Sequence, residues 1–144
     1  MYNLLKGKRG IIFGALDSKS IAWKVAERAH EEGAKFVLTN APVALRLGTI
    51  SELAEKTGSE VIAADATSIM DLEHLVEETL AKLGGKIDFV LHSIGMSVNV
   101  RRGNPYTHQD YNFTKTGWDF SALSFHITMS VLYNKEAFRE WATI

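Results

Sequence analysis

The stretch RGIIFGALDSKSIA, residues 9–22, decides the fold of this chain. An apolar run ends at Gly14, a polar turn follows, and an apolar-periodic helix begins near Ser20. A strand, a tight turn and a helix start in this order present unpaired backbone N–H groups and the positive end of a helix dipole, which suits the pyrophosphate of a dinucleotide. Gly14 provides the turn conformation, and Ser20 is a good N-cap whose hydroxyl can also face a phosphate. The spacing does not match G-x-G-x-x-G, so an ordinary strand–helix turn with a serine cap is the alternative.

Composition bounds the class of protein. The chain has 144 residues, 46% of them hydrophobic and 23% charged, with a net charge of −1, as expected for one globular domain. The charge balance argues against nucleic acid or an anionic membrane surface as a partner, and no apolar run approaches the length of a membrane span. Cysteine is absent and the five histidines are not clustered, so we expect no disulfide, thiol nucleophile or metal site. Without a signal peptide, a cytoplasmic location is the default.

Short apolar runs alternate with helical patterns through most of the chain. The predicted strands are residues 10–13, 35–39, 60–65 and 87–91, and the predicted helices are residues 20–32, 50–56, 72–83 and 118–133. Residues 96–115 are predicted to form a long polar loop, residues 136–141 one or two helical turns, and residues 142–144 the start of a fifth strand.

This alternation predicts a Rossmann-like doubly wound α/β fold with a parallel sheet in the order 3-2-1-4. Ligands bind such sheets beyond the carboxyl ends of the strands, where the strand order reverses. We therefore expect Gly14, Asp65 and Gly95 to lie along one edge.

Several side chains at this edge have two interpretations. The second strand ends at Thr39-Asn40-Ala41 without the acid that usually binds the adenosine ribose, so Asn40 or the backbone would meet the diol. Asp65 is placed either to bind the adenine amino group or to cap a turn. Arg46 is a candidate for a 2′-phosphate, although a solvated surface arginine is favoured, and His92 is favoured as a packing histidine.

Tyr111 and Lys115 spell Y-x-x-x-K, the acid–base pair of many short-chain dehydrogenases. The pair follows the fourth strand, whereas that chemistry belongs on a helix after a fifth strand. Ordinary polar residues are therefore the favoured interpretation, and a different short-chain dehydrogenase using Tyr111 and Lys115 stays as an alternative.

Three segments together resemble a known family. They are Gly14-Ala15 with Ser20-Ile21-Ala22, then Asp65-Ala66, then His92-Ser93-Ile94-Gly95. In combination they resemble the NADH-dependent enoyl-[acyl-carrier-protein] reductases of bacterial fatty-acid synthesis, which are divergent short-chain dehydrogenases. Both the long Gly…Ser-Ile-Ala turn and the His-Ser-Ile-Gly segment are variants found in these reductases.

The resemblance implies a role for each matching residue. Gly14, Ser20 and Ile21 would lie at the pyrophosphate, and Asp65 with Ala66 around adenine. Ser93, Ile94 and Gly95 would lie by the ribose and nicotinamide, and Gly95 with Met96 would border the acyl pocket. Ser121 or Ser124 would replace a structural polar residue of the family. NADH is the expected cofactor, with NADPH possible.

The resemblance also implies the reaction, in which nicotinamide delivers hydride to the β-carbon of a trans-2-enoyl thioester carried by acyl carrier protein. The family uses Tyr and Lys spaced Y-x-x-x-x-x-x-K beyond the fifth strand, and no tyrosine here has a lysine at that spacing. We therefore expect residues 1–144 to be the amino-terminal, dinucleotide-binding part of a single short-chain-dehydrogenase domain, inactive alone. A non-catalytic NAD-binding fragment is the alternative. The family also implies a homo-oligomer, a tetramer, and an unpaired fourth strand would favour association.

Overall fold

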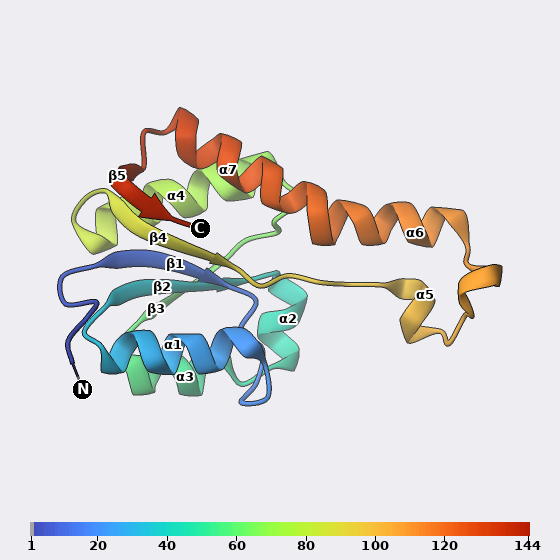
Figure 1. The fold of residues 1–144 in the computed structure, drawn as a ribbon, viewed down its shortest axis with the longest axis horizontal. Coiled ribbons are helices and arrows are strands. Elements are labelled where there is room, and N and C mark those ends of the chain that lie inside the picture. Colours follow the sequence, from blue (N-terminus) through green and yellow to red (C-terminus); the bar gives the residue numbers. More distant parts are fainter. Residues whose placement is uncertain (1) are drawn as a thin grey trace.

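The computed structural model describes residues 2–144 as one five-stranded sheet with helices on both faces (Figure 1). The strand order is β3-β2-β1-β4-β5, and every pairing is parallel, so the doubly wound fold predicted from the sequence is confirmed. The strands are β1 (Arg9–Phe13), β2 (Lys35–Asn40), β3 (Glu60–Ala63), β4 (Ile87–His92) and β5 (Phe138–Thr143).

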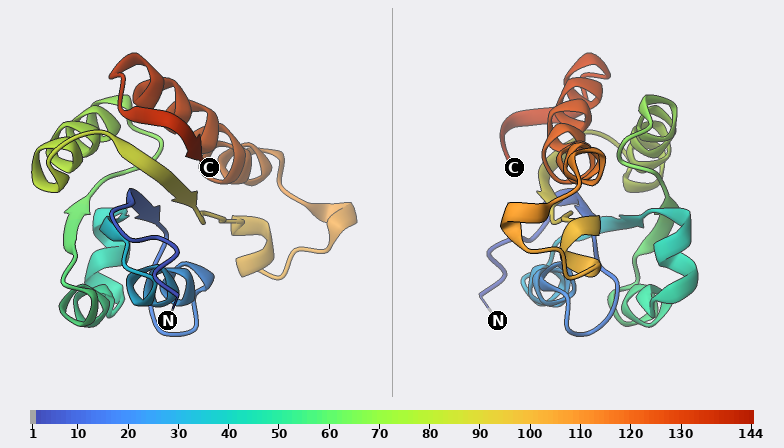
Figure 2. Two further views of the ribbon diagram at one scale, coloured as in Figure 1. Left: turned by 60° about the vertical axis from the view of Figure 1, so that its left-hand side comes forward. Right: turned by 90° about the vertical axis from the view of Figure 1, so that its right-hand side faces the viewer.

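Two helices cover each face of the sheet, with α1 and α3 on one side and α4 and α7 on the other (Figures 1 and 2). The helices are α1 (Ile21–Glu31), α2 (Pro42–Leu47), α3 (Ile50–Thr57), α4 (Ile69–Leu83), α5 (Val98–Arg101), α6 (Tyr111–Trp118) and α7 (Ser124–Asn134). A 3₁₀ turn covers Tyr106–His108, and a π-helical turn, Asp119–Leu123, joins α6 to α7.

The central strand explains this layering. Ile11 and Phe13 of β1 point into the core cluster beneath α4 and α7, whereas Ile12 between them points into the cluster beneath α1 and α3. All three side chains are at most 1% exposed. A strand buried on both faces needs apolar residues at consecutive positions, because successive side chains point to opposite faces.

The expected fifth strand is present, but it begins at Phe138 rather than at residue 142, and this corrects two other expectations. Residues 136–141 do not form helical turns, because Phe138–Thr143 pairs with β4 and the Ile87 N–H donates to the Ala137 carbonyl at 2.9 Å. The strand order therefore extends beyond the predicted 3-2-1-4, and β4 is not an unpaired edge. The pairing is irregular, with a register shift between Ile87 and Phe89, and Trp141 has a φ of +64°. Pairing with β4 thus outweighs the weak local preference of this segment.

Asp88 ties the amino-terminal ends of three strands together. Its carboxylate accepts hydrogen bonds from the Arg9 N–H at 2.9 Å and from Lys8 Nζ at 3.1 Å. The guanidinium Nη1 of Arg139, in β5, lies 3.5 Å from Asp88 Oδ2. Burial raises the pKa of Asp88, but the hydrogen bonds from Arg9 and Lys8 together with the positive charges of Arg139 and Lys8 outweigh it and hold the pKa below its usual range.

Residues 97–118 form an arm that projects beyond the sheet (Figures 1 and 2). The sequence predicted a long polar loop over residues 96–115, but α5, the 3₁₀ turn and most of α6 lie there. Asn99, only 1% exposed, holds the arm together. Its side chain donates to the Asp110 carbonyl and Thr114 Oγ1 and accepts from Asn104 Nδ2 and the Asp110 N–H, at 2.9–3.1 Å. Part of the polar composition therefore forms an internal network around Asn99, while most other side chains of the arm are exposed.

Among residues 2–144, no helix is both long enough and apolar enough to cross a membrane.

Candidate functional site

Gly14 lies where the carboxyl ends of β1, β2 and β4 meet. Its N–H donates to the Thr39 carbonyl at 3.1 Å, and its φ is +91°. A Cβ built on Gly14 would lie 2.0 Å from the Ser93 carbonyl oxygen, so only glycine fits between these strand ends. The close approach that this geometry shows is to the Ser93 carbonyl. The predicted approach of Gly14 to a pyrophosphate stays a prediction.

Ser20 shapes the turn between β1 and α1. Its hydroxyl donates to the Asp17 carbonyl at 2.7 Å and accepts from the Leu16 N–H at 3.2 Å, and it makes no capping bond to α1. The side chain therefore closes the turn instead of acting as the expected helix cap. The first N–H groups of α1, beginning at Ile21, have no intrahelical partners, and the Ile21 side chain is 74% exposed.

Two residues that the sequence did not single out support the same turn. The Thr49 N–H donates to the Leu16 carbonyl at 2.9 Å. A Cβ on Gly48 would lie 2.3 Å from that carbonyl oxygen, so glycine is required at this approach as well. The contact joins segments far apart in the sequence, and the Gly48-Thr49 dipeptide alone gives no signal for it.

Asn40 at the end of β2 is engaged inside the protein. Its Nδ2 donates to the Ala15 carbonyl at 3.0 Å, and its Oδ1 accepts from the Ala41 N–H at 2.9 Å. These bonds fix the β1–α1 turn against β2. A ribose diol at this position would compete with them, so the predicted ribose contact of Asn40 stays a prediction.

Asp65, just beyond β3, has the turn-capping role that was one of its two interpretations. Its Oδ1 accepts from the Thr67 N–H at 2.8 Å and from Thr67 Oγ1 at 2.7 Å, and its own N–H donates to Asp71 Oδ2. Neither bond uses Asp65 Oδ2, so contact with an adenine amino group remains a prediction. Ala66 is 7% exposed and packs in the core.

The segment after β4 changes from buried to open within a few residues. Ser93 contacts Gly14 through its carbonyl, and Ile94 packs against the core cluster beneath α4 and α7. Gly95 is exposed, and a Cβ added there would meet nothing within 4 Å. This open space borders the strand-order reversal between β1 and β4, where doubly wound sheets bind ligands.

Two serines of the helix that follows the arm hold this segment. Ser121 Oγ accepts from the Met96 N–H at 3.0 Å and donates to the Met96 carbonyl at 3.2 Å. Ser124 Oγ lies 2.9 Å from His92 Nε2. The sequence named Ser121 or Ser124 as a structural polar residue; the Ser124 hydroxyl contacts the last residue of β4, and the Ser121 hydroxyl contacts the segment after it.

His92 is a packing histidine, as the sequence favoured. Its ring lies 6.0 Å from the Phe13 ring and 5.4 Å from the Phe125 ring, between centroids. Because Ser124 donates its hydroxyl hydrogen to the Phe120 carbonyl at 2.6 Å, His92 Nε2 must carry the hydrogen between His92 and Ser124. Burial lowers the pKa of His92, which favours the neutral ring.

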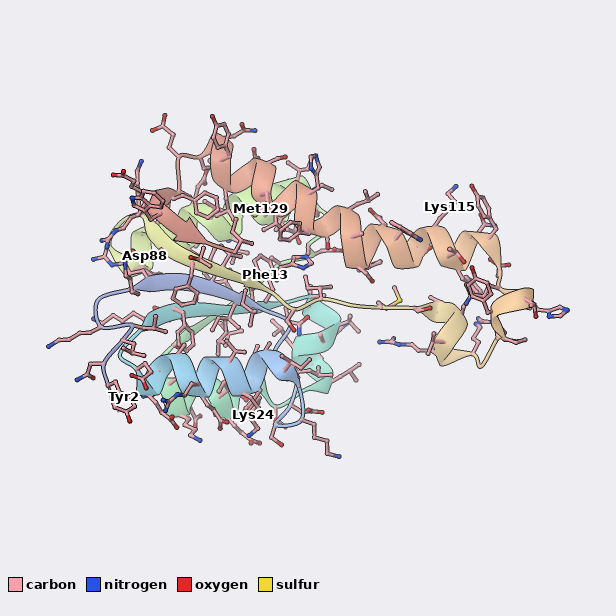
Figure 3. All side chains as sticks on the ribbon, viewed as in Figure 1. Tyr2, Phe13, Lys24, Asp88, Lys115 and Met129 are labelled. Atoms are coloured by element: carbon pink, nitrogen blue, oxygen red, sulfur yellow. The ribbon has the colours of Figure 1, made fainter. Side chains whose placement is uncertain are left out.

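Tyr111 and Lys115 do not face the strand-order reversal. Both belong to α6 in the arm, and Lys115 lies far from Phe13 at the end of β1 (Figure 3). Tyr111 is 74% exposed, and Lys115 Nζ lies 5.6 Å above its ring. The arrangement gives no support to the alternative in which this pair performs acid–base catalysis. Arg46 is an exposed residue of α2.

Residues 2–144 contain no group of three or more His, Cys, Asp or Glu side chains that could hold a metal ion. The sheet edge presents backbone amides, hydroxyls and the carboxylates of Asp17 and Asp65. These groups suit a phosphate-bearing ligand with ribose and base moieties.

Comparison with known proteins decides the family. A family model described as "Enoyl-(Acyl carrier protein) reductase" matches residues 14–144. The chain belongs to this family. Among curated relatives, it is 36% identical over 125 residues to "Enoyl-[acyl-carrier-protein] reductase [NADH] 1" of Rhizobium meliloti, covering 85% of this chain and 44% of that protein. It is 32% identical to the corresponding enzyme of Mycolicibacterium smegmatis, covering 87% of this chain and 47% of that enzyme. The resemblance stated from the sequence is confirmed.

Solved structures of the family share the fold. The FabI–NADH complex of Alistipes finegoldii matches with a TM-score of 0.96 and 57% identity, covering 98% of this chain and 50% of that chain. The enoyl-[acyl-carrier-protein] reductase of Aquifex aeolicus matches with a TM-score of 0.82 and 27% identity, covering 95% of this chain and 53% of that chain. The chain thus spans about half the length of the relatives that it matches.

Proposed function

We propose that this chain forms the dinucleotide-binding part of an NADH-dependent enoyl-[acyl-carrier-protein] reductase. The observation that carries the proposal is its likeness, at 57% identity over 98% of the chain, to the FabI–NADH complex of Alistipes finegoldii. Residues 1–144 would then be the amino-terminal part of a single short-chain-dehydrogenase domain.

The residues at the sheet edge fit a dinucleotide. Gly14 adds no side chain at the end of β1, and the free first N–H groups of α1 follow this turn, which suits a pyrophosphate at the helix start. Ser20 and Ile21 would border the phosphates, Asn40 the adenosine ribose, and Asp65 with Ala66 the adenine. Ser93, Ile94 and Gly95 would then lie along the ribose and nicotinamide.

The open space at Gly95 supports a nicotinamide position, and Met96 would border the acyl pocket beside it. When bound, the nicotinamide supplies the hydride for reduction of a trans-2-enoyl thioester carried by acyl carrier protein. The residues of this chain would bind the dinucleotide and orient its nicotinamide. They would not supply the family's Tyr and Lys, since no tyrosine of the sequence has a lysine seven positions later. That pair would have to come from outside residues 1–144.

The proposal includes NADH as the cofactor rather than NADPH. The curated relatives that carry NADH in their names support this choice. A homo-oligomer and a cytoplasmic location, which the family resemblance implies, are also part of the proposal.

The experiment measures binding and turnover separately. Calorimetric titration of the 144-residue chain should detect binding of both NADH and ADP-ribose, because the two ligands share the adenine, two riboses and the pyrophosphate. Adenosine, which lacks the pyrophosphate, should bind much more weakly. Absorbance at the NADH band should show no oxidation dependent on a short trans-2-enoyl thioester. A chain that binds neither NADH nor ADP-ribose would overturn the proposed cofactor site, and clear turnover would overturn the assignment of catalysis to residues outside it.

A further inference from the structure

The arm, residues 97–118, differs in charge from the rest of the chain. It holds three of the 16 Lys and Arg residues and one of the 17 Asp and Glu residues, which gives it a net charge of +2. The whole chain has a net charge of −1, so the residues outside the arm carry −3. Positive charge is therefore concentrated in the segment that projects beyond the sheet (Figures 1 and 2).

The three cations of the arm have no carboxylate partner. Seven other lysine and arginine side chains form ion pairs with acids, but within residues 2–144 no ion pair involves Arg101, Arg102 or Lys115. The acid of the arm, Asp110, accepts the Phe113 N–H at 3.0 Å and so caps α6. The positive charges of the arm are thus not neutralised by contacts within the chain.

Two of these cations are held against aromatic rings. Cζ of Arg102 lies 4.8 Å from the centroid of the Phe113 ring, and Lys115 Nζ lies 5.6 Å from the centroid of the Tyr111 ring. Such cation–π contacts stabilise one position of a long side chain. A cation that is fixed before a partner arrives loses less side-chain entropy on binding, so the arm is partly prepared for association.

Exposed tyrosines accompany the cations. Tyr106 is 89% exposed, and Tyr111 is 74% exposed. Tyrosine and arginine are the residue types enriched in protein–protein interfaces. A nucleic acid is bound through contacts to many phosphates, and three cations can supply few of them. The composition of the arm therefore favours an acidic protein surface over a nucleic acid.

The arm begins beside the proposed acyl pocket. Strand β4 runs through Gly95 and Met96 directly into α5, beyond the carboxyl ends of the strands (Figure 1). Arg101 is the last residue of α5, five positions after Met96. Because three of the intervening steps are helical, the two Cα atoms lie within about 12 Å of each other. A protein bound at Arg101 would therefore lie next to the segment that borders the acyl pocket.

We propose that the arm is a docking surface for the acyl carrier protein that brings the enoyl thioester, and that Arg101 and Arg102 contact acidic side chains of that protein. The inference rests on the proposed function, which names this carrier. It adds the surface on which the carrier binds. In this role the two arginines contact the carrier protein and not the dinucleotide.

The test measures binding of crotonyl acyl carrier protein to the 144-residue chain by calorimetry, with NADH present. The double variant Arg101→Glu/Arg102→Glu should raise the Kd at least about tenfold, because two attractions become repulsions. Arg101→Lys/Arg102→Lys keeps both charges and should change the Kd less than about threefold. Raising the salt concentration from about 50 to about 300 mM should weaken binding of the unaltered chain several-fold.

Lys6→Glu/Lys86→Glu is the matched control, because it changes the net charge by the same amount. Both lysines are exposed and lie before β1 and β4, at the opposite edge of the sheet from the arm. This variant should change the Kd for the carrier protein less than about threefold. All variants should bind NADH within about twofold of the unaltered chain. If the arm double variant fails to fold by circular dichroism, Arg101→Glu alone repeats the test, because Arg102 makes the contact with Phe113.

Equal weakening by the arm and control variants, or an unchanged Kd after reversal of the two arginines, would overturn the docking surface. A chain that binds NADH but not the carrier protein would overturn it as well. Tighter binding of a single-stranded RNA oligonucleotide, lost in the same arm variant, would assign the arm to nucleic acid instead. A chain that binds neither NADH nor the carrier protein would overturn the proposed function itself.

Discussion

Replacing Gly14 by alanine would place a methyl carbon 2.0 Å from the Ser93 carbonyl oxygen, well inside van der Waals contact. The substitution has two costs. A residue with a side chain at a φ of +91° costs about 1–2 kcal/mol of backbone strain. Forcing β1 and β4 apart to admit the methyl group adds about 1–3 kcal/mol, as overpacking a close-packed core does. We therefore expect Gly14→Ala to lower the free energy of unfolding by about 2–5 kcal/mol.

Gly58 provides a control that separates these two costs. Its φ is +62°, and a Cβ added there meets nothing within 4 Å. Gly58→Ala should therefore incur only the backbone strain, about 1–2 kcal/mol. The two variants would be compared with the unaltered chain by urea denaturation, followed by tryptophan fluorescence and circular dichroism. The midpoint should fall further for Gly14→Ala than for Gly58→Ala.

Equal losses in the two variants would refute the reasoning. They would mean that the ends of β1 and β4 separate without cost, so that the contact between Gly14 and Ser93 is not a rigid part of the site. A larger loss for Gly14→Ala should also come with weaker NADH and ADP-ribose binding, since the Ser93 carbonyl borders the proposed site.

Three other substitutions test separate parts of the structure. Asn99→Ala removes four hydrogen bonds within the arm and should speed tryptic cleavage there at least about tenfold, whereas Asn112→Ala, on the exposed face of α6, should not. Asp88→Asn should lower stability at pH 7 by about 2 kcal/mol. Because the folded-state pKa of Asp88 is lowered, its contribution is present above the unfolded pKa, near 4, and the difference between the two proteins should vanish as the pH falls through the folded pKa. The pKa of His92 is also lowered on folding, so the unfolded chain binds more protons than the folded one. The free energy of unfolding should therefore fall as the pH drops below about 6.5. His92→Gln should reduce this dependence of the free energy of unfolding on pH, in denaturation curves measured between about pH 5 and about pH 7.5.

The central sheet could be predicted from the sequence because its signals are local. Strands buried on both faces need continuous apolar runs, and Gly33, Gly58 and Gly84 end the helices before β2, β3 and β4 with positive φ values. The glycine at position 14 could likewise be found from the apolar run that it ends. These features depend on neighbours within a few residues, so one sequence contains them.

The arm and the first residues of β5 depend on contacts that no local pattern shows. Asn99 resembles any loop asparagine until the fold brings Asp110 and Thr114 around it. Phe138–Thr143 has a mixed composition and becomes a strand because β4 offers it an edge. In the site, the sequence suggested that Ser20 and Asn40 face a ligand, whereas their side chains are largely occupied with the turn between β1 and α1. Chemical type predicted where these residues lie, but not which partners they have.

The helical residues from Tyr111 to Asn134 form one uninterrupted rod, about 36 Å long at 1.5 Å per residue. One end of the rod belongs to the arm, and the other packs beside α4 in the core (Figure 1). The π-helical turn that contains Ser121 lies between these two ends. Because Ser121 is bonded to both backbone groups of Met96, we expect a tilt of the outer end of the rod to shift the segment that follows β4 as well.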